Sequence, residues 1–80
     1  MINAGIPDHD YIIARKQNFA NNGDIVVALI DGEETTVKRY FRDIRNIRLQ
    51  PENDKYKPIL GSDNIKVLGK VISVFRIDSL

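Results

Sequence analysis

The residue best suited to chemistry in this 80-residue chain is Lys38, which lies inside a β-branched and aromatic segment running from Glu33 to Phe41. An ammonium group held against a sheet is partly desolvated, and desolvation disfavours the charged form of a lysine. Because a neutral amine can take a proton from a nucleophile, Lys38 is a candidate general base. The alternative is an ordinary solvated strand lysine, since lysine side chains are seldom buried without a partner.

Other residues with chemical potential carry weaker signals. The run Asp8-His9-Asp10 places the only histidine between two carboxylates, which could favour its charged form or bind a cation. Adjacent residues in a turn rarely converge on one metal ion, so an exposed polar turn is the favoured interpretation. The only serines are Ser62, Ser73 and Ser79, and none lies in a Gly-x-Ser-x-Gly or Ser-x-x-Lys pattern. None of them is therefore expected to act as a nucleophile.

A cluster of basic residues around Lys38 suggests a different function. The cluster consists of Lys38, Arg39, Arg42, Arg45 and Arg48, interleaved with Tyr40 and Phe41. Small β modules bind nucleic acids with such combinations of basic and aromatic side chains. Acidic residues among the same strands cancel much of the positive field, namely Glu33, Glu34, Asp43, Glu52 and Asp54. We expect a solvated mixed-charge face and keep a stand-alone nucleic-acid-binding module as the alternative.

The elements that must position Lys38 are short strands, and the predicted fold class is all-β with small, strongly twisted antiparallel sheets. Residues 24–30 are apolar on both faces, which is typical of a central strand. In the strand of Lys38, alternation with period 2 places Thr36, Lys38 and Tyr40 on one face. The other predicted strands are residues 11–15, 47–50, an edge piece at 57–60 that contains Pro58, and 65–77.

Turn residues separate these strands. The sequence Asn21-Asn22-Gly23 predicts a turn in which Gly23 takes a positive φ. Asp31-Gly32 between two β-rich segments predicts a two-residue hairpin connection. Gly69, inside the long last strand, indicates a bulge or a sharp bend.

Length and composition indicate one domain that spans residues 1–80. With 42% hydrophobic and 29% charged residues the chain is neither disordered nor membrane-bound, and its longest apolar run, residues 25–30, is too short to span a bilayer. The first residues do not resemble a signal segment. The absence of cysteine excludes thiol catalysis and fits a cytoplasmic location. A net charge of +1 provides no general attraction to nucleic acid, and no cofactor or metal is expected.

Five sequence blocks, in order and spread over nearly the whole chain, resemble the self-cleaving domain of LexA-type repressors, which are S24-type serine peptidases. The blocks are Met1-Ile2-Asn3-Ala4-Gly5-Ile6-Pro7-Asp8, Gly23-Asp24-Ile25-Val26-Val27-Ala28, Thr36-Val37-Lys38-Arg39, Leu49-Gln50-Pro51-Glu52-Asn53 and Leu68-Gly69-Lys70-Val71. Lys38 matches the general-base lysine of the family's Ser/Lys dyad. The family serine stands directly before the methionine that matches Met1, so these 80 residues are expected to lack the nucleophile and to be inactive. The position of His9 is usually glycine in the family.

The resemblance also implies a β-fold like that of LexA and signal peptidases, here incomplete at its amino-terminal end. In the parent repressor, an activated RecA filament favours self-cleavage in the linker, which separates the operator-binding domain and derepresses DNA-damage genes. These partners belong to the full-length parent, and no membrane partner is expected. The resemblance further implies a homodimer, with strand exchange as one form of it, through Val71, Ile72, Ser73, Val74 and Phe75. A non-catalytic relative retained for dimerisation is a second alternative.

Overall fold

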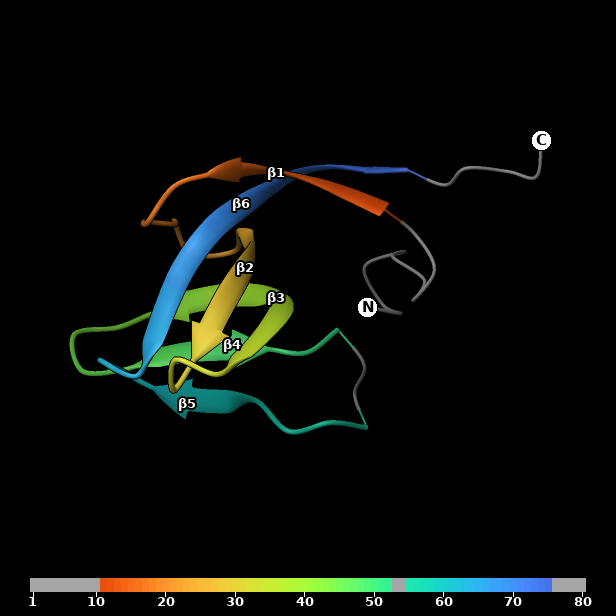
Figure 1. Ribbon diagram of the computed structural model, residues 1–80. Coiled ribbons are helices and arrows are strands. Elements are labelled where there is room, and N and C mark those ends of the chain that lie inside the picture. Colours follow the sequence, from red (N-terminus) through yellow and green to blue (C-terminus); the bar gives the residue numbers. More distant parts are fainter. Residues whose placement is uncertain (1–10, 53–54, 76–80) are drawn as a thin grey trace.

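The computed structural model describes residues 11–52 and 55–75, and within them the chain forms one antiparallel sheet without helices (Figure 1). The strands are β1 Tyr11–Lys16, β2 Ile25–Ile30, β3 Glu34–Arg42, β4 Ile47–Gln50, β5 Ile59–Gly61 and β6 Ile65–Phe75. Their order across the sheet is β1-β6-β2-β3-β4-β5. The all-β prediction is confirmed, with a single sheet in place of several in the described part of the chain.

The structure contains the predicted strands, and the residues at which they begin and end differ slightly from the prediction. The strand apolar on both faces is β2, which lies in the interior of the sheet between β6 and β3. Pro58 directly precedes β5, an edge strand, as expected for a residue without a backbone N–H. The last strand was predicted to reach residue 77; β6 ends at Phe75, and residues 76–77 lie outside the described part.

The connection between β2 and β3 is one residue longer than predicted. Asp31 and Gly32 both have positive φ, 54° and 68°, as a type I′ turn requires, and the Glu33 N–H donates to the Ile30 carbonyl at 3.0 Å. Strand pairing begins only at Ile30 and Glu34, so Glu33 belongs to the connection. The predicted two-residue hairpin is therefore wrong by this extra residue, although the turn residues behave as expected.

The last strand, β6, is shared between two neighbours. Residues 65–70 pair with β2 and residues 69–75 pair with β1, and Figure 1 shows β6 running from β2 to the ribbon that it forms with β1. Val27 faces Gly69 while Ala28 faces Val67, which leaves Leu68 as the extra residue of a bulge. A Cβ on Gly69 would lie 2.8 Å from the Arg15 carbonyl oxygen. The predicted bulge is confirmed, and close backbone approach explains the glycine.

Apolar side chains are buried on one face of the sheet, which we call the core face. The buried residues are Val26, Ala28, Ile30, Tyr40, Leu49 and Ile65. Cross-strand pairs connect Tyr40 to Leu49 and Ile30 to Ile65, so the core extends from β6 through β2 and β3 to β4. Full burial of an aliphatic side chain contributes about 1.5–3 kcal/mol, and a core of this size gives modest stability. Among the described residues, no helix is long and apolar enough to cross a membrane.

Candidate catalytic lysine site

Lys38 lies on the core face of β3. Its cross-strand partner in β2 is Val26, which is completely buried, and the following residue on the same face is the buried Tyr40. The side chain of Lys38 is itself partly buried. The predicted placement of Thr36, Lys38 and Tyr40 on one face is thus confirmed, and it puts the amine beside apolar surface.

The amine of Lys38 turns back along its own strand. Its Nζ donates to Thr36 Oγ1 at 2.6 Å and makes a longer contact of 3.4 Å with the Val37 carbonyl oxygen. A neutral amine that donates to these two oxygens keeps its lone pair available for another proton. Sequence reasoning placed Thr36 on the correct face but gave it no role; the spacing of two residues in a strand was the signal for this partner.

A second lysine occupies the same row of the core face. Lys70 of β6 pairs with Val26 from the opposite side, so Val26 separates the two lysines. The Lys70 amine lies 3.6 Å from Asp24 Oδ1 in a partly exposed ion pair. Asp24 Oδ2 accepts the N–H of Asn21 at 2.9 Å. The carboxylate is thus engaged with Lys70 and with its own turn, while Lys38 pairs with neutral oxygens.

We call the opposite face of β3 the outer face. Hydrogen bonds on this face and along the backbone connect β3 to neighbouring segments of the chain. Arg39 Nε lies 2.6 Å from Glu52 Oε1, and Arg39 Nη1 donates to the Gly23 carbonyl at 2.7 Å. The Gly23 N–H donates to the Tyr40 carbonyl at 2.8 Å, and the Tyr40 N–H donates to the Asp24 carbonyl at 2.7 Å. Gly23 has the predicted positive φ, 93°. These bonds fix the backbone on the carboxyl-terminal side of Lys38.

The basic cluster predicted around Lys38 is divided between the two faces. Lys38 lies on the core face, whereas Arg39 and Arg48 lie on the outer face, because Arg48 pairs with Phe41 across β3 and β4. The Arg48 guanidinium lies 4.6 Å from the centre of the Phe41 ring in a cation–π contact. Arg39 thus pairs with Glu52 and Arg48 contacts Phe41. The cluster therefore does not form one continuous basic surface.

The residues predicted for dimerisation lie on the ribbon of β1 and β6. Beyond Lys70, β6 pairs with β1 alone, so the other backbone edge of residues 71–75 has no strand beside it among the described residues. Ile72, Val74 and Phe75 are exposed. Tyr11 of β1 stacks on Phe75, with 5.8 Å between ring centres. This ribbon combines a free edge with exposed apolar side chains.

Two of the remaining candidates, Ser62 and Ser73, lie outside β3, the strand of Lys38. Ser62 lies in the turn before β6, where its N–H donates to Asn64 Oδ1, and Ser73 pairs with Ile13 in the ribbon. Asp8-His9-Asp10 and Ser79 lie outside the described residues. Within the described ranges, no group of three or more histidine, cysteine, aspartate or glutamate side chains could hold a metal ion.

Comparison of the sequence with known proteins gives matches that agree with one another and cover most of the chain. The family described as Peptidase S24-like matches residues 1–72. The chain is 59% identical over 76 residues to the LexA repressor of Enterococcus faecalis and 55% identical over 76 residues to the LexA repressor of Bacillus subtilis. Each alignment covers 95% of this chain, but only 36% and 37% of the respective relatives. The chain therefore spans little more than a third of the length of these repressors.

Proposed function

The chain belongs to the Peptidase S24-like family, and from this premise we propose that it is the part of a LexA-like transcriptional repressor that supplies the general base for self-cleavage. The observation that carries the proposal is the position of Lys38. Lys38 lies on the core face, and its partly buried amine donates to Thr36 Oγ1 at 2.6 Å. A fixed amine beside apolar surface is suited to accept a proton from a hydroxyl group.

The proposed reaction is an intramolecular acyl transfer. Neutral Lys38 removes the hydroxyl proton of a serine that stands directly before Met1 in the longer repressor. The serine oxygen then forms a bond to a carbonyl carbon in the repressor's own linker, and the peptide C–N bond breaks. The resulting lysine ammonium returns the proton to the leaving amine. Thr36 contributes by holding the amine of Lys38 in place.

For the 80 residues alone we propose no peptidase activity. Catalysis by this mechanism needs a nucleophile beside the base, and Ser62 and Ser73 lie on other elements than Lys38, in the turn before β6 and in the ribbon, respectively. A base without a nucleophile leaves only water to attack an unactivated amide. What remains for this part of the chain is dimerisation through the segment Val71 to Phe75, which within the described residues has a free edge and carries exposed apolar side chains.

The longer repressor would act in the cytoplasm with two further partners. We propose that its DNA-binding part recognises operator DNA and that an activated RecA filament promotes the cleavage-competent state, which links repression to DNA damage. Similarity to proteins named LexA repressor supports the repressor role. These partners are proposed for the longer protein, of which this chain is similar to about a third.

The experiment uses an extended protein that carries the preceding family segment, with serine directly before Met1. Its self-cleavage is followed by mass spectrometry, in comparison with Lys38→Ala and Lys70→Ala variants. Lys70 is the matched control, because it lies in the same row but pairs with Asp24. Loss of a general base lowers a rate by roughly 10²–10⁴-fold, and we expect this loss for Lys38→Ala alone. Cleavage that fails in the Lys70 variant and persists in the Lys38 variant would reassign the base.

A further inference from the structure

The turn before β2 contains the only asparagine–glycine step of the chain, Asn22-Gly23. Such a step is prone to deamidation, because glycine has no side chain to obstruct attack of its nitrogen on the preceding amide carbon. The turn is on the surface, and Asn22 is exposed to water. Exposure and sequence alone would predict rapid deamidation here.

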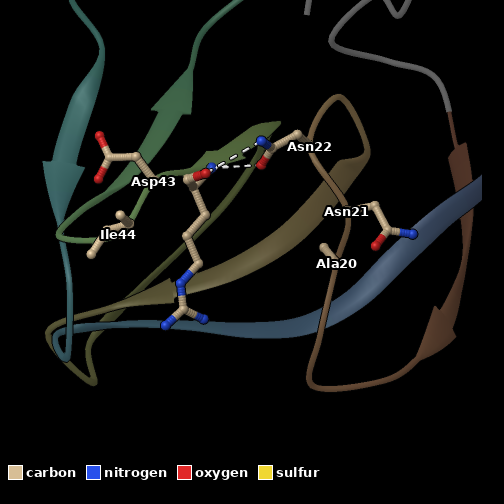
Figure 2. A pocket seen from close by; sticks show the side chains of 6 residues that line it. Ala20, Asn21, Asn22, Asp43 and Ile44 are labelled. Carbon is tan, nitrogen blue, oxygen red and sulfur yellow. Dashed lines mark hydrogen bonds between the residues drawn. The ribbon is translucent and has the colours of Figure 1, made fainter.

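In the folded chain both reacting groups are bound to β3. The Arg42 N–H donates to Asn22 Oδ1 at 2.7 Å, and Figure 2 marks the hydrogen bonds of the Asn22 side chain with dashed lines. Asn22 Nδ2 donates in return to the Arg42 carbonyl at 3.3 Å. The nitrogen that would attack, that of Gly23, donates to the Tyr40 carbonyl at 2.8 Å. We call these three hydrogen bonds the turn clasp.

We propose that Asn22 is a latent deamidation site that the turn clasp keeps closed, and that local release of the turn from β3 opens it. On release, the Gly23 nitrogen loses its proton and forms a bond to Asn22 Cγ. The bond from Cγ to Nδ2 breaks, and ammonia leaves. Water then opens the cyclic imide at either carbonyl, which gives aspartate or isoaspartate at position 22.

Either product prevents the clasp from closing again in its original form. A carboxylate has no N–H to donate to the Arg42 carbonyl, and isoaspartate also adds a methylene group to the main chain of the turn. At least one bond of the turn clasp, the one from Asn22 Nδ2 to the Arg42 carbonyl, is therefore lost permanently. The modification acts at Arg42, the last residue of β3, which is also the strand of Lys38.

The first test compares the folded chain with a synthetic peptide of residues 18–28 in the same mildly alkaline buffer. Peptide mass mapping follows the change of amide to carboxyl at Asn22, separately from isoaspartate formed at Asp31-Gly32. The deamidation rate of the folded chain scales with the fraction of molecules in which the turn is open. We therefore expect this rate to be at least roughly tenfold lower than that of the peptide. Equal rates in chain and peptide would overturn the proposal.

The second test weakens the attachment of the turn. Arg39→Ala removes the bond from Nη1 to the Gly23 carbonyl together with the ion pair to Glu52, whereas Arg48→Ala, on the same face, removes the contact with Phe41 and leaves the bond to Gly23 in place. We expect faster deamidation at Asn22 in the Arg39 variant alone, checked for folding by circular dichroism. If that variant does not fold, the wild-type chain is followed in increasing urea. Deamidation that rises before global unfolding supports local release, and deamidation that rises only with global unfolding contradicts it.

Discussion

At the scale of single residues, the environment of Lys38 differs from that of an ordinary strand lysine. Its amine is bound to the hydroxyl of Thr36 and lies on the core face opposite buried Val26. Strand alternation predicted which residues share this face. It did not predict the bond to Thr36, because the conformation of a long lysine side chain depends on the neighbouring strand as well as on its own.

Replacing Thr36 tests whether its hydroxyl positions the amine. Thr36→Val keeps the branched shape and removes the acceptor, and in the extended protein we expect self-cleavage to slow by about tenfold, the usual effect of one lost hydrogen bond. The control is Thr35→Val, an exposed position on the other face of β3. Rates are measured by densitometry of the cleavage products. Equal slowing by both variants would mean that Thr36 has no specific role.

At the scale of elements, the turn between β3 and β4 shows how one carboxylate fixes a connection. Asp43 Oδ1 accepts the N–H groups of Arg45 and Asn46, each at 2.8 Å. The bond from Asn46, then that from Arg45, lowers the pKa of the Asp43 carboxyl. A pKa lowered by folding adds stability above the pKa of the unfolded carboxyl, and this stability is lost as the pH falls through the folded-state value.

We therefore expect Asp43→Ala to destabilise the chain at neutral pH and to have a smaller effect in acid. The measurement is the urea concentration at the unfolding midpoint, determined for wild-type and variant at a series of pH values from neutral to acidic. Asp63→Ala, in the exposed turn before β6, serves as the control for removing a negative charge. A difference between wild-type and Asp43→Ala that grows on acidification would contradict the role given to this carboxylate.

The elements themselves were largely predictable because their signals are local. Alternation and turn residues predicted the strand at residues 47–50 without error, and Gly69 marked the bulge. The extra residue Glu33 in the hairpin was missed, because the start of strand pairing depends on the register of β2 and β3 along their whole length. The sharing of β6 between β2 and β1 also depends on contacts distant in sequence.

At the scale of the whole molecule, the ribbon of β1 and β6 is the surface best suited to self-association. We expect a dimer at micromolar concentration by light scattering, and Val74→Asp or Phe75→Asp should shift it to monomer by placing a charge on an apolar contact. Ile44→Asp is the control, because Ile44 is fully exposed in a turn outside the ribbon. A folded wild-type monomer across this concentration range would exclude the proposed dimer.

The divided basic cluster leads to a further expectation for the whole chain. Arg39 and Arg48 are engaged with Glu52 and Phe41, and the net charge is only +1. We expect weak binding to DNA or RNA at physiological salt, measured by fluorescence anisotropy, and little change on replacing Arg42, Arg45 and Arg48 together. Tight binding that falls steeply with added salt would favour the nucleic-acid module instead.

The pH dependence of self-cleavage in the extended protein tests whether Lys38 is the base of a self-cleaving repressor. A lysine amine is a base only when neutral, so the wild-type rate should rise with pH into the alkaline range. In Lys38→Ala this pH-dependent cleavage should be absent, while Lys70→Ala should keep it. A Lys38→Ala protein that cleaves as fast as wild-type, with the same pH profile, would contradict this role of Lys38.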